Sequence, residues 1–93
     1  MRAIDWTAQF KRDYKREGKG KHRKTIDETL FAIVDFLAND LALEPKFRDH
    51  ALAGEWKDTR DCHIKPDLVL IYQKPDRATL RLVRLGSHSE LRI

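Results

Sequence analysis

The stretch "RDCHIKPDLVLIYQK", residues 60–74, carries the pattern that decides the fold. Residues 60–65 alternate in polarity, as in a strand with one buried face, and residues 68–74 form an apolar run typical of a buried strand. The three residues KPD between them predict a tight turn, because proline fixes its own backbone and cannot donate to a strand ladder. Strands joined by so short a turn must run antiparallel.

Further strands are predicted on both sides of this hairpin. Residues 47–54, "FRDHALAG", predict a short strand or extended segment that ends at Gly54, and residues 78–86, "ATLRLVRLG", predict the last long strand. A second turn is expected at residues 74–77, "KPDR". Residues 2–4 could add a short first strand.

The first half of the chain is predicted to be helical. A first helix, which Asp5 or Thr7 could cap, is indicated by aromatic residues at every fourth position, namely Trp6, Phe10 and Tyr14. A second helix is expected over residues 21–39, with its buried face marked by Ile26, Leu30, Ile33 and Leu37. The chain is then one α+β domain over residues 1–93, an N-terminal helical hairpin packed on one face of a small antiparallel β-sheet.

Composition and charge favour a soluble protein with a polyanionic partner. The chain is 41% hydrophobic and 37% charged, and no apolar run approaches the ~20 residues that span a membrane. With a single cysteine and no apolar N-terminal signal, we expect a cytoplasmic protein. Residues 1–24 hold nine Lys and Arg against three acidic residues, whereas residues 25–45 hold five acids and no Lys or Arg. The basic surface could bind RNA phosphates, and solvated helix faces remain the alternative.

Strand alternation sorts the polar candidates by face. Asp61 and His63 point one way, and Cys62 and Ile64 the other. If the helices cover the side with Cys62, then Asp61 and His63 lie on the open face. On the last strand, strict alternation places Leu80, Leu82 and Arg84 on one side. The sequence does not decide whether that side or the opposite one faces the helices.

Three of the four histidines, His50, His63 and His88, fall in the sheet half of the chain. Histidine gives and takes protons near neutral pH. A lone histidine in a sheet is more often structural, but three on elements that must pack side by side make a proton-transfer site an equal alternative. With Asp61 and Asp67, these histidines could supply the acid and base that cut an RNA phosphodiester.

Such a cut also needs positive charge, since charge develops on the phosphate as the 2′-hydroxyl attacks it. Arg60, Lys65 and Arg84 could supply the cations. A metal site is disfavoured, because no His, Cys or Asp pair has a familiar zinc spacing. Cys62 is predicted to be a half-buried strand residue and not a nucleophile.

Two segments within residues 49–91, "DHALAGEWKDTRDCHIKPDLVLIYQK" and "LRLVRLGSHSEL", resemble the YafQ branch of the RelE/ParE toxin superfamily. That branch shows DH-x-L-x-G-x-W, then R-D-x-H-[IV]-x-P-D running into a strand that ends I-Y, then R-x-G-[ST]-H. The resemblance implies a RelE-like fold and a toxin of a type II toxin–antitoxin module. Such toxins enter the ribosomal A site and cut the mRNA codon there without a metal or other cofactor, and a partner antitoxin silences them.

The resemblance also implies roles for individual residues. His88 matches the family's main catalytic histidine, and His50 and His63 would assist it as base or charge stabiliser. Asp61 and Asp67 would be the acidic partners of these histidines.

The binding residues implied by the resemblance are cationic. Arg84 matches an arginine that holds the scissile phosphate. YafQ-like chains often place a base-stacking aromatic residue one turn after the last histidine, but residues 91–93 hold none. Stacking there would be either lost or replaced by the guanidinium plane of Arg92. Ribosomal RNA would be contacted by the basic residues of the first half, here Lys19, Lys21, Arg23 and Lys24. The alternative is a non-catalytic RNA- or ribosome-binding module of the same fold.

Overall fold

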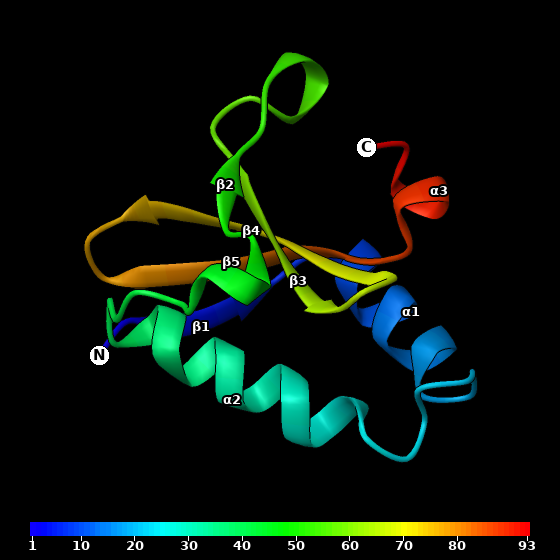
Figure 1. The fold of residues 1–93 in the computed structure, drawn as a ribbon. Helices are drawn as coiled ribbons and strands as arrows, with labels where there is room; N and C mark the ends of the chain where they lie inside the picture. Colours follow the sequence, from blue (N-terminus) through cyan, green and yellow to red (C-terminus); the bar gives the residue numbers. More distant parts are fainter.

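A computed structural model describes residues 1–93 and contains one five-stranded sheet (Figure 1). Its strands lie in the order β1-β5-β4-β3-β2, with bounds Ala3–Trp6 for β1, His50–Ala51 for β2, Arg60–Lys65 for β3, Leu68–Asp76 for β4 and Thr79–Gly86 for β5. Neighbouring strands from β2 to β5 pair antiparallel, but β1 pairs parallel with β5. The α+β class is confirmed, and a wholly antiparallel sheet is wrong at β1. Parallel pairing is possible there because a long connection, including two helices, separates the two strands.

The helices are α1 (Ala8–Glu17), α2 (Ile26–Ala38) and the short α3 (His88–Leu91), with 3-10 turns η1 (Pro45–Phe47) and η2 (Gly54–Trp56). Thr7 caps α1, because its Oγ1 accepts a hydrogen bond of 3.0 Å from the amide of Phe10. Trp6, the first of the three aromatic residues that indicated the first helix, lies instead in β1 and is 47% exposed. The aromatic spacing therefore predicts the helix correctly at Phe10 and Tyr14, both of which pack in or against the core, and is wrong at Trp6.

The second helix begins at Ile26, five residues later than predicted. Residues 18–25 form turns. A dense run of basic side chains around Gly20 explains this, since glycine costs about 1 kcal/mol in a helix and like charges four residues apart, here Lys19 and Arg23, repel on one helix face. The predicted turn at residues 74–77 is also displaced, because β4 continues to Asp76 and its register with β5 shifts between Gln73 and Asp76, around Pro75.

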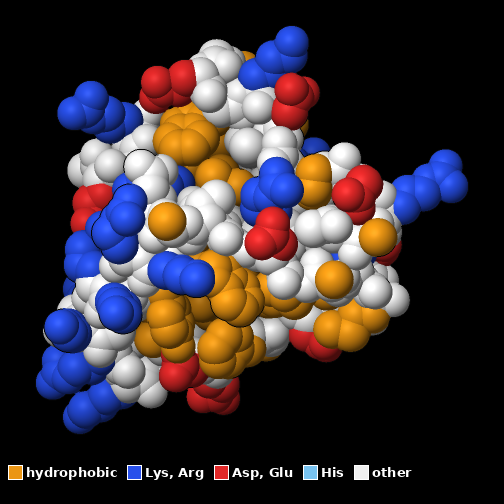
Figure 2. Space-filling view, turned by 180° about the vertical axis from the view of Figure 1, so that it is seen from behind, with side chains coloured by type: hydrophobic (Ala, Val, Ile, Leu, Met, Phe, Trp, Pro, Cys, Tyr) orange, Lys and Arg blue, Asp and Glu red, His pale blue; other side chains and the backbone are white.

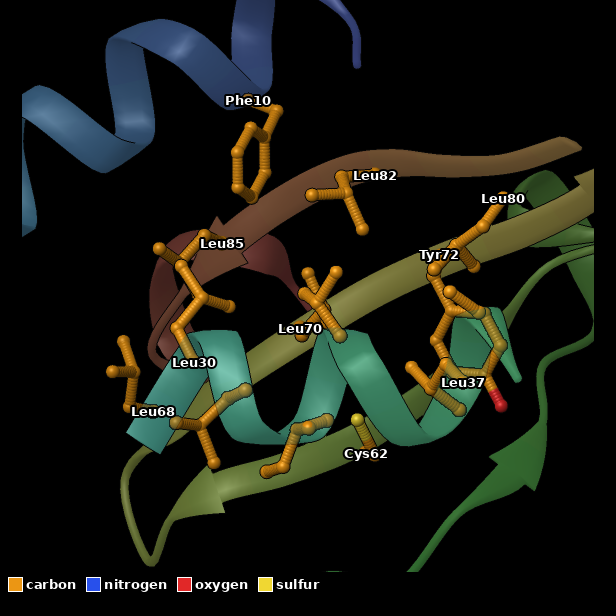
Figure 3. Packing of buried hydrophobic residues seen from close by; sticks show 14 of the residues in the cluster. Phe10, Leu30, Leu37, Cys62, Leu68, Leu70, Tyr72, Leu80, Leu82 and Leu85 are labelled. Carbon is orange, nitrogen blue, oxygen red and sulfur yellow. The ribbon is translucent and has the colours of Figure 1, made fainter. Parts of the chain in front are cut away.

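The two longer helices, α1 and α2, cover one side of the sheet, which we call the helix face (Figure 3). Its buried side chains include Cys62 and Ile64 of β3, so the opposite side carries Asp61 and His63, as strand alternation predicted. We call that opposite side the histidine face. A smaller cluster lies there, made by Val69, Ile71 and Leu91.

A β-bulge in β5 overturns the strict alternation expected for that strand. Ile71 is opposite Arg84 but Tyr72 is opposite Leu82, so Val83 is the extra residue. Leu85 consequently joins Leu82 in the core of the helix face, and Arg84 moves to the histidine face.

One part of the apolar surface is not covered by other elements. A groove of about 520 Å³ is lined mainly by apolar side chains of β1, α1 and α2, with one contribution from β5: Ile4, Trp6, Phe10, Tyr14, Leu30, Phe31, Val34 and Leu82. Figure 2 shows hydrophobic side chains gathered on one side of the molecule beside a cluster of Lys and Arg. None of the helices combines the length and apolar composition that crossing a membrane requires.

Candidate active site

The strand pairing places the predicted site residues in two adjacent rows across the histidine face. One row runs from His50 through Asp61 and Ile71 to Arg84. The next row includes His63, which is opposite Val69. Because neighbouring strands are about 4.8 Å apart, residues far apart in sequence converge on one surface.

His88 reaches this surface through α3, a helix that the sequence prediction missed. Ser87 Oγ accepts the amide hydrogen of Glu90 at 3.1 Å, and Glu90 Oε1 accepts that of Ser87 at 3.0 Å. This capping box was visible as Ser-His-Ser-Glu in the sequence and was the signal for the helix. It begins α3 at His88, whose ring meets the ring of His63 edge to face with centroids 4.9 Å apart.

The paired rings open onto a groove of about 560 Å³. Its lining combines His63 and His88 with three cationic side chains, those of Lys46, Arg48 and Lys65. Sequence reasoning identified Lys65 but missed the other two, although "PKFRDH" places them directly before His50. Two proton-transfer groups beside three cations form a site suited to a phosphodiester.

His50 stands beside a buried carboxylate. Its Nδ1 lies 2.7 Å from the carbonyl oxygen of Arg48 and 2.9 Å from Oδ1 of Asp61. The Nδ1 hydrogen is directed at the Arg48 oxygen, so Asp61 Oδ1 accepts no well-directed hydrogen bond although Asp61 is only 2% exposed. Burial raises the pKa of Asp61, and the three histidines 50, 63 and 88 oppose that rise when charged. Asp61 is thus the carboxylate whose charge acts on all three histidines.

His63 is the histidine whose protonation is most clearly biased. Burial lowers its pKa below the usual value, the neighbouring His88 lowers it further, and Asp61 acts in the opposite direction. A lowered pKa keeps the imidazole neutral near pH 7, which is the state that can accept a proton.

Asp67 lies apart from His50, His63 and His88. Its carboxylate is bound by Lys21 and by His22, whose Nε2 is 3.1 Å away, and the hydrogen bond from Lys21 is the main cause of its lowered pKa. This contact ties residues 19–24, the predicted ribosome-binding segment, to the turn between β3 and β4. Lys19, Arg23 and Lys24 are exposed there.

Two of the predicted RNA-binding arginines are engaged by acidic residues. Arg60 pairs with Tyr72 and shares the helix face with it, so it is not beside the histidines. Its Nε lies 3.2 Å from Asp49 Oδ1. Arg84 is on the histidine face, but its Nε is 2.7 Å from Asp13 Oδ2. Arg92 is exposed at the end of α3.

Comparison with known proteins identifies the class of protein first. A family model described as the bacterial toxin of type II toxin–antitoxin systems, YafQ, matches residues 2–93. The mRNA interferase toxin YafQ of Escherichia coli is 34% identical over 91 residues, which cover 98% of this chain and 96% of that protein. The chain therefore belongs to the YafQ family of type II toxins.

Solved structures agree with this assignment. A copper-bound mutant toxin from Helicobacter pylori superposes with a TM-score of 0.84 at 38% identity, covering 98% of this chain and 99% of its own. The E. coli DinJ–YafQ toxin–antitoxin complex superposes with a TM-score of 0.82 at 35% identity, covering 97% and 96%. The predicted RelE-like fold is thereby confirmed.

Proposed function

We propose that this toxin is a ribosome-dependent mRNA endoribonuclease that cuts the A-site codon and so stops translation. The observation that carries the proposal is the contact of the His63 and His88 rings, 4.9 Å apart, in a groove lined by Lys46, Arg48 and Lys65. The name of the E. coli relative, mRNA interferase, supports the same activity.

The proposed reaction is metal-free acid–base cleavage. Neutral His63 takes the proton of the RNA 2′-hydroxyl, whose oxygen then forms a bond to the adjacent phosphorus. The bond from phosphorus to the 5′-oxygen breaks, and His88, in its protonated form, donates a proton to that oxygen. The products are a 2′,3′-cyclic phosphate and a 5′-hydroxyl, so atoms and protons balance.

The surrounding residues supply charge for this reaction. Lys46, Arg48 and Lys65 stabilise the negative charge that develops on the phosphate. Asp61 stabilises the charged histidines, among them His50. Arg84 would contact the phosphate through the part of its guanidinium that Asp13 leaves free, and Arg92 would stack on a base.

The proposed partners are the ribosome with its mRNA, in the cytoplasm, and a cognate antitoxin. The exposed basic side chains of residues 19–24 offer contacts to ribosomal RNA phosphates. For the antitoxin, we propose coverage of the cationic residues Arg60, Lys65 and Arg84, of which Arg60 lies on the helix-face side of the sheet. The apolar groove between α1, α2 and β1 is a second candidate surface. Hydrogen exchange with and without antitoxin tests both, since a covered surface exchanges more slowly.

The first experiment adds purified toxin to one mRNA, free and on programmed ribosomes, with and without EDTA on the free RNA, and maps the new 5′ ends. We expect cuts only on ribosomes, at the A-site codon. Cuts in free RNA that EDTA abolishes would contradict the metal-free mechanism. The EDTA control is included because a relative, a mutant toxin, was solved with copper bound. Ribosome binding without any cut would instead support the non-catalytic module.

A further inference from the structure

The outer edge of β5 lacks a strand partner where it approaches the active site. β1 pairs with β5 only over residues 79–82. Beyond this point α1 lies along the edge, and the hydroxyl of Thr7 donates to the carbonyl oxygen of Val83 at 2.7 Å. A buried backbone N–H or C=O needs a partner, so side chains of α1 must replace the missing strand.

Asp13 and Arg16 of α1 provide this replacement at Leu85, which is fully buried. The Leu85 amide donates to Asp13 Oδ2 at 3.0 Å, and the Leu85 carbonyl oxygen accepts from Arg16 Nη2 at 2.9 Å. One helix turn thus satisfies both backbone groups of a single strand residue.

The carboxylate of Asp13 is itself nearly inaccessible, with 3% of the residue exposed. Arg84 Nε donates to it at 2.7 Å and Arg16 Nη1 at 3.0 Å. A buried carboxylate is tolerated only when it is paired and hydrogen-bonded, and this one is bound from α1 and from two consecutive residues of β5. The proposed reaction assigns Asp13 no chemical step.

The same contacts extend to α3. Arg16 Nε lies 3.1 Å from Oε2 of Glu90, the residue that closes the capping box with Ser87. Gly86 leaves room for this contact, because a Cβ there would lie 2.9 Å from Arg16 Nη2 and 3.3 Å from Glu90 Oε1. α1 therefore holds the end of β5 and the start of α3 together.

The side chain of His88 makes no hydrogen bond to the protein, although His88 is the first residue of α3. Its orientation depends on its backbone and on the contact with His63. We propose that Asp13 is a positioning residue for cleavage: by holding Leu85, Arg84 and Arg16, it sets the backbone from which His88 meets His63 and the substrate. This inference rests on the proposed endoribonuclease function.

The test compares Asp13→Asn with Asp40→Asn. Asparagine keeps the shape of the side chain but removes its charge and one acceptor. Asp40 is the control for the loss of a carboxylate that accepts from two cations, Arg2 at 2.8 Å and Lys74 at 2.7 Å, and none of these residues lines the groove. Its side chain is 55% exposed, whereas that of Asp13 is 5% exposed. Cleavage on programmed ribosomes is measured per folded molecule, well below the unfolding midpoint of each variant.

For Asp13→Asn we expect kcat to fall about 10- to 100-fold while KM for programmed ribosomes changes less than about 3-fold, since a displaced catalytic group slows chemistry and not binding. In the free protein, the nuclear Overhauser contacts between the His63 and His88 rings should weaken. Asp40→Asn should leave both readouts at the wild-type level. A wild-type kcat in Asp13→Asn, or an equal loss in Asp40→Asn, would overturn the inference.

Two further arms keep the outcome decisive. If Asp13→Asn does not fold, Arg16→Gln replaces it, because the Arg16 side chain is 42% exposed and its removal still breaks the links to Leu85 and Glu90. A wild-type kcat and unchanged ring contacts in that variant would overturn the inference. If the wild-type toxin itself does not cut, the proposed function fails, whereas the ring contacts still decide whether Asp13 positions His88.

Discussion

The two faces of the sheet differ in what their side chains do. On the helix face, Leu70, Tyr72 and Leu80 are at most 1% exposed and belong to a core cluster of 15 buried residues. On the histidine face, the buried apolar cluster has three residues, and charged and titratable side chains lie beside it. Because side chains alternate along each strand, the same strands present an apolar core on one side and a reactive surface on the other.

This difference separates stability from chemistry. Burying a side chain such as leucine contributes about 1.5–3 kcal/mol, so most of the stabilisation comes from the helix face. The stabilisation from the helix face offsets the desolvation cost of Asp61 on the other face. Asp61 is a buried carboxylate, and one of its oxygens lacks a directed hydrogen bond. Substitutions on the two faces should therefore produce opposite patterns of loss.

The largest effect is expected for His88→Ala. Removing the proposed acid should lower the cleavage rate about 10²- to 10⁴-fold, the usual contribution of a general acid or base. Since the His88 side chain is half-buried and makes no hydrogen bond, the free energy of unfolding should stay close to that of the wild type. Single-turnover cleavage and urea denaturation measure the two quantities, and near-normal cleavage would contradict the assignment of His88.

The converse substitution is Leu70→Ala on the helix face. It should lower the free energy of unfolding by about 2–5 kcal/mol, through lost burial and the cavity left behind. His63→Ala, the matched change on the other side of the sheet, should alter it by less than about 1 kcal/mol but abolish most cleavage. Equal destabilisation by both substitutions would show that the histidine face also carries the fold.

A smaller effect, on pH dependence, is expected for Asp61→Asn. The charge of Asp61 raises the pKa of His63, so its removal should lower that pKa further. If neutral His63 is the base, activity is lost as the pH falls through the His63 pKa, and this loss should move to lower pH in the variant. Rate–pH profiles and NMR titration of the His63 ring measure the shift.

The control for that shift is Asp58→Asn. Asp58 has a φ of +68°, a conformation that asparagine tolerates, and it lies in the turn before β3. Asp58→Asn should leave the rate–pH profile unchanged. If the acid-side loss of activity stays at the same pH in Asp61→Asn, or moves to higher pH, another group controls that side of the rate–pH profile.

The smallest effect is expected for Asp67→Asn. Its contacts with Lys21 and His22 indicate that it holds the basic segment 19–24, so cleavage should fall less than about 10-fold, as for other exposed ion pairs. Lys21→Ala, which breaks the same tie, should give a similar loss. A loss above a hundredfold in Asp67→Asn alone would support the catalytic role that family resemblance implies.

Much of the histidine face could be predicted from the sequence. The alternation around Cys62, the turn after β3 and the apolar run of β4 are local patterns, and the structure confirms the strands they predict. These patterns placed Asp61 and His63 on the side opposite Cys62, and the structure decides that the helices cover the side with Cys62. Lys46 and Arg48 were missed because a cation before a short strand has no distinctive spacing.

Other features depend on contacts between distant parts of the chain. The bulge at Val83 moves Arg84 to the histidine face, which strict alternation had paired with Leu82. The contacts of Lys21 and His22 with Asp67 likewise join segments about 45 residues apart. No local pattern determines these contacts, because their free energy comes from partners that meet only in the folded chain.

The sequence by itself therefore determined where β3, β4 and β5 lie, which side chains of β3 share a face, and that three histidines accompany a basic surface. Those properties follow from backbone preferences and strand alternation, which act over a few residues. Only the tertiary structure decided that His88 meets His63, that Asp61 is the carboxylate whose charge acts on all three histidines, and that Asp13 holds the end of β5. These pairings depend on the bulge, on α3 and on the packing of α1 along an unpaired edge, which are set by long-range contacts.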